Sequence, residues 1–290
     1  MSQSERSRAA RIRAKATGQS YQKTLESADG EPTSAQQELE GLFLRHLGSP
    51  WSTPASEDES ASGIVRLEPR YEGLTVHFGR DTNLGDLSER LLPVLENEST
   101  PDAPDDGEVW GVPGLRKRAH EAGTSLFRPG IAAEIVLAGI LPEDLVPVDH
   151  RDPRSGERPT GWTLQETRFT EKYPLYTGLD IESVMLRRLG IIRAARPWGV
   201  HTWRGPWPTD MVIELAFDAN ITREQAQHLK DDLTSKYLVP QLVVNRFEAP
   251  RGPSGSSFFD LSIPSTGHSV QVRLLHSPRP AQRRRDNLVK

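Results

Sequence analysis

The sequence predicts an α+β protein built mainly on antiparallel sheet, with a central strand–helix–strand unit and disordered basic termini. Residues 211–217 alternate apolar and mixed side chains with a period of two, which is typical of a strand with one buried face. Thr222 and Gln225 have the spacing of a capping box and begin a helix. Apolar side chains then recur at helical spacing: Ala226, Leu229, Leu233 and Tyr237. Pro240 ends this helix, and residues 242–247 start the next strand.

The composition limits the class of protein. The chain has 290 residues and a formal net charge of -4, a length that allows one large domain or two small ones. It contains no cysteine, which excludes disulfides, thiolate metal sites and a cysteine nucleophile. The longest apolar run, residues 131–141, is well short of the ~20 residues that span a bilayer. Residues 1–13 lack the apolar core of a signal peptide, so we expect a cytoplasmic protein without membrane contact.

Charge is segregated along the chain. Basic residues crowd both ends, and residues 96–108 form an acidic segment between them. We expect residues 1–30 and 278–290 to be disordered basic tails, because their few apolar side chains cannot offset the entropy of ordering. Residues 31–63 should contain a short helix at 34–47, followed by a linker rich in serine, proline and acidic residues.

One segment of the N-terminal tail resembles known sequences. Residues Arg13 to Leu25 read RAKATGQSYQKTL and share a Thr-Gly-x-Ser-Tyr core with short basic segments at the N-termini of some uncharacterised actinobacterial proteins. This resemblance covers 13 residues and implies no activity.

The globular body is predicted at residues 64–277. Two alternating apolar stretches within residues 64–78 predict a hairpin, and residues 84–95 predict a helix that Pro93 ends early. The body is either a single unit or two subdomains, residues 64–100 and 109–277, separated by the acidic segment.

Further elements follow along the body. The three basic residues at 116–118 are predicted to begin a short helix, and residues 131–138 to form a buried, alanine-rich helix. Asp180 can cap a helix over residues 181–189, and residues 259–274 predict a hairpin. Residues 78–91 and 217–229 both run from a strand through a short polar loop into a helix, which hints at two related halves.

The candidate binding surface is the segment 196–207, RPWGVHTWRGPW, which we expect to form an irregular turn rich in glycine and proline. Tryptophan and arginine supply the flat contacts and bidentate hydrogen bonds that dominate many interfaces. The candidate residues are Arg196, Trp198, His201, Trp203, Arg204 and Trp207. In the alternative interpretation, the tryptophans cover the edge of the sheet entered at Met211 and the arginines stack on them.

Signals for catalysis are weak. The segment Asp149 to Asp152 contains His150 in a polar loop, and no metal-binding histidine motif, phosphate-binding glycine loop or serine-hydrolase motif occurs in the chain. We therefore expect no metal and no cofactor. An enzyme would have to use His201 or His150 without a recognisable motif.

Three functional hypotheses remain. The leading one is a non-enzymatic cytoplasmic binding or adaptor protein that engages a protein partner through its basic tails and the Trp/Arg-rich segment. The second is a nucleic-acid-associated accessory protein that makes non-specific contacts with the phosphate backbone. Its candidate contacts are Arg6, Arg8, Arg11, Arg13, Lys15, Arg283, Arg284 and Arg285. The third is an enzyme with a histidine-containing site.

Overall fold

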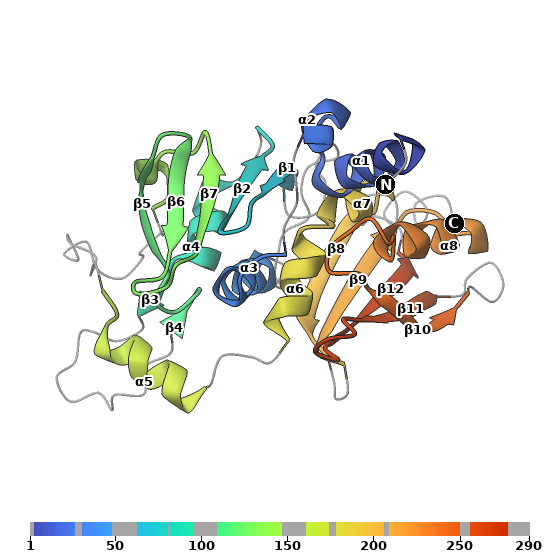
Figure 1. Cartoon of the computed structure of the whole chain (residues 1–290). Helices are drawn as coiled ribbons and strands as arrows, with labels where there is room; N and C mark the ends of the chain where they lie inside the picture. Colours follow the sequence, from blue (N-terminus) through green and yellow to red (C-terminus); the bar gives the residue numbers. More distant parts are fainter. Residues whose placement is uncertain are drawn as a thin grey trace, which may run out of the picture.

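Two five-stranded sheets flank a central pair of helices in the computed structural model, as Figure 1 shows, and this arrangement confirms the α+β class. The structure describes residues 3–26, 31–47, 63–80, 82–95, 109–146, 161–173, 178–205, 209–249 and 256–277. The acidic segment 96–108 and the C-terminal tail 278–290 lie outside these ranges. Buried apolar side chains from both sheets and from the helices between them form one continuous core.

The first sheet, sheet A, belongs to the N-terminal half of the body. The helix α3 (Ser34–Leu47) precedes the predicted hairpin, β1 (Ile64–Pro69) and β2 (Gly73–Phe78). The helix α4 (Leu84–Leu91) follows, and then β3 (Val94–Leu95) and β4 (Val109–Trp110) pair with each other as a separate two-stranded sheet, sheet B. The sheet is completed by β5 (Arg116–His120), β6 (Gly123–Phe127) and β7 (Glu134–Ala138). The spatial order is β1-β2-β7-β6-β5, and only the β2–β7 contact is parallel.

The second sheet, sheet C, belongs to the C-terminal half. The helices α6 (Leu179–Leu186) and α7 (Leu189–Ala194) lead into β8 (Gly199–Arg204) and β9 (Met211–Phe217). The helix α8 (Arg223–Leu233) comes next, with the predicted capping box between Thr222 and Gln225. The sheet then ends with β10 (Val243–Glu248), β11 (Ser257–Ser262) and β12 (Ser269–His276). Its spatial order is β8-β9-β12-β11-β10, with only β9–β12 parallel.

The two sheets have the same topology. In each half a hairpin is followed by a helix and then by a three-stranded meander, whose last strand lies parallel to the second strand of the hairpin. The connections correspond as well, because Asn83 caps α4 five positions after Phe78, and Thr222 caps α8 five positions after Phe217. The resemblance between residues 78–91 and 217–229 therefore reflects two halves with one fold.

A sequence repeat covers the two central helices, α3 and α6, and the residues that follow them. Residues 38–48 read ELEGLFLRHLG and residues 180–190 read DIESVMLRRLG, at a constant offset of 142 positions. Five of the eleven aligned pairs are identical, and the other six are similar in size or chemistry. The identical pairs are Glu40 and Glu182, Leu44 and Leu186, Arg45 and Arg187, Leu47 and Leu189, and Gly48 and Gly190.

The repeated residues join the halves in a reciprocal way along the contact between α3 and α6, which we call the seam. Arg187, at the C-terminal end of α6, donates to both oxygens of Glu40 at 2.7 and 2.8 Å, and Arg45 of α3 donates to Glu182 through Nε at 2.7 Å. Such exchange of partners is the pattern of a two-fold interface between identical units. Gly41 permits the close approach, because a Cβ atom there would lie 2.3 Å from the carbonyl oxygen of Leu179.

The N-terminal segment differs from the expected disordered tail over its described part. Residues 3–26 form α1 (Gln3–Thr17) and α2 (Tyr21–Glu26). The buried Ala9, Ala10 and Ala16 form the packing face of α1. Gly190 of α7 lies so close to the end of α1 that a Cβ would be 2.3 Å from the Lys15 carbonyl. The alanines and the glycine allow α1 to pack closely against α7. The sequence-based expectation of disorder considered large apolar side chains and so missed this contact.

Several element predictions are corrected by the structure. Residues 116–118 and 131–138 do not form helices, because β5 and β7 occupy these positions as strands. Consecutive residues around Ile135 are apolar because β7 is the central strand of sheet A. Its side chains are buried on both faces of the sheet. The predicted helix after Thr222 ends at Leu233, before Tyr237. The helix α5 (Leu164–Lys172) was not predicted, whereas the single turn η2 (Pro142–Asp144) lies where residues 142–145 of the sequence predict one helical turn.

Candidate interaction surface

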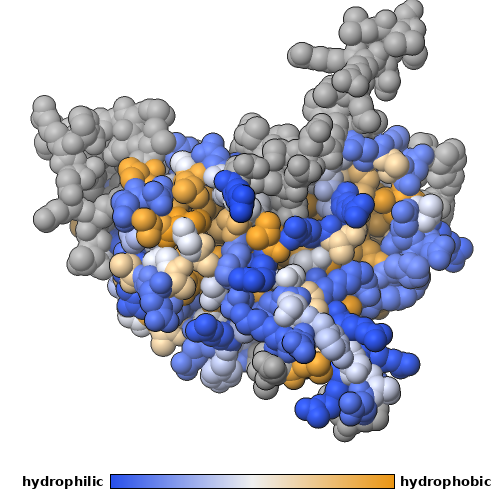
Figure 2. Space-filling model, turned by 90° about the horizontal axis from the view of Figure 1, so that it is seen from above, coloured by the Kyte–Doolittle hydropathy of each residue, from blue (hydrophilic) through white to orange (hydrophobic). Residues whose placement is uncertain are grey.

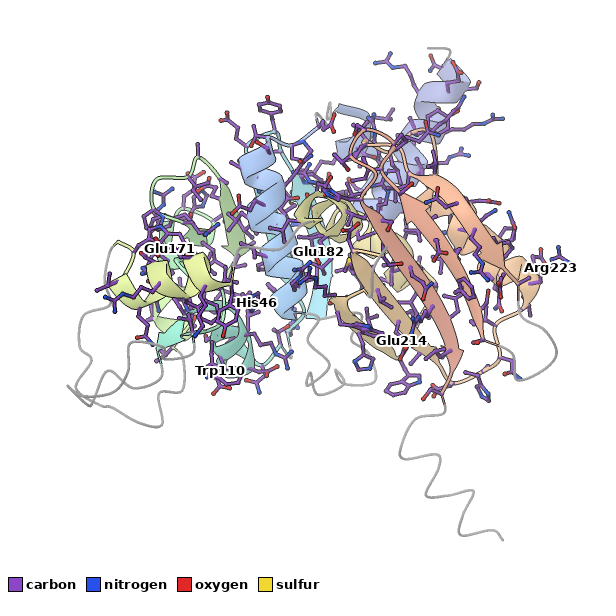
Figure 3. The ribbon with its side chains drawn as sticks, turned by 90° about the horizontal axis from the view of Figure 1, so that it is seen from below. His46, Trp110, Glu171, Glu182, Glu214 and Arg223 are labelled. Atoms are coloured by element: carbon purple, nitrogen blue, oxygen red, sulfur yellow. The ribbon has the colours of Figure 1, made fainter. Side chains whose placement is uncertain are left out.

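The open face of sheet C is the strongest candidate for a functional surface, and we call it the outer face. The inner face carries Ile213, Leu215 and Val272, which belong to the core shared with α6 and α8. Because side chains alternate along a strand, the residues between them point to the outer face. In Figure 3 no helix lies across the side of sheet C that bears Glu214. This face is therefore presented to solvent by a rigid, well-packed sheet.

The strand register arranges the outer-face side chains in two rows across all five strands. The first row runs from β8 to β10 through Trp203, Val212, Gln271, Asp260 and Arg246. The second row runs parallel to it through His201, Glu214, Arg273, Phe258 and Glu248. Most of these side chains are half-buried, whereas Val212 is fully buried beneath its neighbours and Arg246 is exposed.

Stacking and hydrogen bonds connect the two rows. The guanidinium of Arg273 lies 5.7 Å from the centre of the Trp203 ring and donates through Nε to Gln271 at 2.6 Å. Gln271 in turn donates to Asp260 at 2.9 Å. At the far edge, Arg246 lies 4.8 Å from the centre of the Phe258 ring. These contacts hold two aromatic rings and two arginines in place before any partner arrives.

The predicted Trp/Arg segment contributes to this surface only in part. Residues 199–204 are not an irregular turn, since they pair with β9 as the edge strand β8. The β-branched and aromatic residues of this stretch favour a strand, and the prolines fall outside it. Of the six candidate residues, His201 and Trp203 reach the outer face, and Trp207 lies outside the described residues.

The remaining candidates lie apart from Trp203. Trp198 precedes β8 and donates through its indole nitrogen to the carbonyl of Ser277 at 2.5 Å, so it ties the end of β12 to the start of β8. Arg196 is exposed and adopts a positive φ of 58° at the turn out of α7. Arg204 is exposed at the opposite end of β8. An arginine stacks on Trp203 at the sheet edge, but it is Arg273, which lies outside this segment and is not one of the arginines of the alternative interpretation.

The histidines do not assemble a recognisable catalytic site. His201 faces Glu214 in the register, and its ring nitrogen Nδ1 is buried without a hydrogen-bond partner in the described structure. His150 lies outside the described residues. Over the ranges that the structure covers, no three histidine, aspartate or glutamate side chains are grouped as metal ligands.

A second polar cluster joins the start of α6 to the turn between β11 and β12. Asp180 contacts Nδ1 of His268 at 2.6 Å and accepts from the hydroxyl of Thr266 at 2.7 Å. Asp210 accepts from the backbone of Ser269 at 2.8 Å. The Thr266 hydroxyl is directed to the carboxylate and not to the imidazole, so this arrangement fastens a loop and does not activate a nucleophile.

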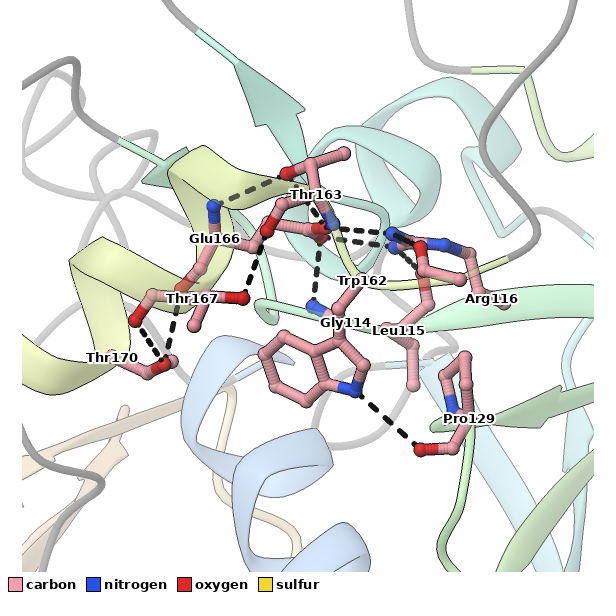
Figure 4. A network of polar contacts seen from close by, with 10 residues as sticks. Gly114, Leu115, Arg116, Pro129, Trp162, Thr163, Glu166, Thr167 and Thr170 are labelled. Atoms are coloured by element: carbon pink, nitrogen blue, oxygen red, sulfur yellow. Dashed lines mark hydrogen bonds and ion pairs between the residues drawn. The ribbon is translucent and has the colours of Figure 1, made fainter. Parts of the chain in front are cut away.

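The buried carboxylate of Glu166 forms the densest polar network, shown in Figure 4. It accepts from the Gly114 backbone at 2.8 Å, from Arg116 at 2.6 and 2.9 Å, and from the Thr163 backbone at 2.9 Å. Burial alone would raise the pKa of Glu166, but these hydrogen bonds outweigh it and hold the pKa below its ordinary value. A carboxylate that is ionised and fully occupied anchors α5 to sheet A and is poorly suited to proton transfer.

The basic candidates of the N-terminus divide into two groups. Arg13 donates to the carbonyl of Tyr237 at 3.4 Å and Lys15 pairs with Asp232, so both dock α1 beside α8. Arg6, Arg8 and Arg11 make no ion pair with any other described residue. The C-terminal candidates Arg283, Arg284 and Arg285 lie outside the described residues.

Comparison with known proteins adds no assignment. No protein-family model, curated protein or solved structure matches this chain. Among the described helices, none is long and apolar enough to cross a bilayer.

Sequence reasoning missed most of the outer face. Arg273, Gln271 and Phe258 alternate with the apolar residues of the predicted hairpin at 259–274, so their common face could be inferred. Their position beside Trp203 could not be inferred from the sequence, because it depends on the parallel pairing of β12 with β9. That pairing joins strands separated by a helix and two further strands.

Proposed function

We propose that the protein is a non-enzymatic binding or adaptor protein that engages a protein partner through the outer face of sheet C. The observation that carries the proposal is the prepositioned pair of Trp203 and Arg273 on an open sheet face. Tryptophan and arginine held in one conformation bury a large area at low entropic cost, which is the property of residues that dominate binding energies.

The charge pattern of the face favours a protein over a polyanion. Acidic side chains at Glu214, Asp260 and Glu248 alternate with basic ones at Arg246 and Arg273, so the face has no net excess of positive charge. A nucleic acid would be repelled by the three carboxylates. A protein surface with an apolar centre and alternating charges would complement it.

Site-specific cross-linking in the cells that make the protein tests the proposal. A photoreactive residue at position 271, in the centre of the outer face, should give a discrete adduct with a protein, and the additional change Trp203→Ala should reduce it. The matched control places the photoreactive residue at Gln227 of α8, a helix on the inner side of sheet C. Equal adducts from both positions, or an adduct that Trp203→Ala leaves unchanged, would refute the proposal.

A further inference from the structure

Three arginines of the helix α1 have no counterion among the described residues, and this helix is separate from the outer face of sheet C (Figure 1). Arg6, Arg8 and Arg11 form no ion pair with another described residue. By contrast, the arginines at positions 45, 66, 116 and 187 each pair with a carboxylate. Arg8 and Arg11 are three positions apart, and like charges at this spacing on a helix repel each other by ~0.2 to 0.5 kcal/mol. The arrangement therefore costs stability in the free protein and favours a negatively charged partner.

The direction of these side chains follows from the packing of α1. At 100° per residue, the buried Ala9, Ala10 and Ala16 define one side of the helix, and Arg8, Arg11 and Lys15 lie on the opposite side. The N-terminal end of α1 projects beyond the rest of the described ribbon in Figure 3. The view from above in Figure 2 looks onto the side of the molecule that carries α1 and α2, and its right-hand part is mainly hydrophilic.

The chemistry of this helix face selects the class of partner. Its solvent-facing positions carry Ser4, Ser7, Arg8, Arg11 and Lys15 and lack large apolar side chains. Insertion into a membrane surface or a protein hot spot needs exposed apolar or aromatic side chains, which this face does not have. Arginine and serine side chains are the donors that contact phosphates in nucleic-acid complexes.

We infer that α1 binds the phosphate backbone of double-stranded nucleic acid without reading its sequence. Arg8 and Arg11 are about 4.5 Å apart along the helix at ~1.5 Å per residue, a length over which a duplex presents more than one phosphate. Because α1 is docked on α7 and beside α8, these charges are held on an ordered helix, and less entropy is lost on binding than for a flexible tail. The contact leaves the outer face of sheet C free.

Fluorescence anisotropy with a labelled 30-base-pair DNA duplex, titrated at several salt concentrations, tests this inference. The full chain should bind duplexes of unrelated sequence equally, with an affinity that falls as salt rises. The variant Arg8→Gln/Arg11→Gln should bind more weakly, and its slope of log K against log salt should be smaller by about 2, since each phosphate contact contributes ~0.9.

The control variant Arg80→Gln/Arg223→Gln removes the same charge from exposed positions outside α1 and should keep the slope of the unaltered protein. Circular dichroism should show both variants folded. Equal losses in the two variants would show a net-charge effect and overturn the inference. So would absence of duplex binding at low salt, or binding of anionic vesicles in place of the duplex.

Discussion

Glu40 and Glu182 occupy equivalent positions in the two halves, but only Glu40 has partners on both carboxylate oxygens. Besides Arg187, Glu40 accepts from Ser183 at 2.7 Å and from Gln36 at 2.8 Å. The positions equivalent to these two donors around Glu182 are Gly41 and Gly178, which have no side chain. Oε2 of Glu182 is accordingly buried without a hydrogen-bond partner within the described structure. The two ion pairs of the seam are therefore equivalent, but only the carboxylate of Glu40 accepts additional hydrogen bonds from neighbouring side chains.

This asymmetry predicts a pH-dependent stability. Burial, opposed by Arg45 and reinforced by the charges of Asp210 and Asp180, raises the pKa of Glu182 from 4.5 to about 7. The folded state therefore holds this proton more tightly than the unfolded state, so the contribution of Glu182 to stability is lost as pH rises from about 4.5 to about 7. Relative to the unaltered protein, Glu182→Gln should become more stable across this interval, as measured by chemical denaturation at each pH.

The comparison with the variant separates Glu182 from other titrating groups. Burial and the neighbouring Arg45 lower the pKa of His46 to about 4, so that group removes stability as pH falls and acts in the opposite direction. His46 is present in both proteins and cancels in the difference. A stability difference that stays constant from pH 4.5 to pH 7 would contradict the prediction.

Breaking the ion pair between Glu40 and Arg187 should lower the stability of the protein strongly. Glu40→Ala leaves Arg187 buried without its carboxylate, so we expect a loss of ~3 to 5 kcal/mol in the free energy of unfolding. The exposed pair of Arg246 and Glu248 provides the control, because Glu248→Ala should change stability by less than ~1 kcal/mol. Chemical denaturation measures both. Similar losses at the two positions would mean that the seam is not held by its ion pair.

Much of the fold could be predicted from local sequence patterns. The hairpins at 64–78 and 259–274, the capping box at Thr222 and the helix at 34–47 all depend on residues close in sequence, and all are found. The errors at 116–118 and 131–138 arise where strand pairing overrides local preference, because β5 and β7 both pair with β6, and β7 also pairs with the distant β2.

The duplication and the site were harder to predict for a related reason. The repeat between 38–48 and 180–190 is legible in the sequence, but the reciprocal pairing of Glu40 with Arg187 requires that the two helices touch. Trp203 was identified from its composition, whereas its partner Arg273 lies 70 positions later and reaches it through the β9–β12 pairing. Long-range contacts of this kind leave no local signal.

The side of α8 that packs against sheet C should contribute strongly to the stability of the C-terminal half of the protein. Leu229 and Leu233 are buried against sheet C, with exposed fractions of 6% and 0%. Each change to alanine should cost ~2 to 5 kcal/mol in the free energy of unfolding, through lost burial and the cavity left behind. His228→Ala, on the exposed side of the same helix, should cost less than ~0.5 kcal/mol. A loss below ~1 kcal/mol at both leucines would show that the helix does not pack as described.

The two described tryptophans of the Trp/Arg segment should separate binding from stability. Trp203 lies half-buried on the outer face, so Trp203→Ala should weaken binding of the cross-linked partner by ~2 kcal/mol or more, about 30-fold in affinity, while the protein stays folded. Trp198 holds the carbonyl of Ser277, so Trp198→Ala should lower the free energy of unfolding by roughly 2 kcal/mol and leave the affinity unchanged. Titration calorimetry and chemical denaturation measure the two effects. If Trp203→Ala unfolds the protein, or if Trp198→Ala reduces affinity as much as Trp203→Ala does, then the rings serve one packed corner and the outer face is not the contact surface.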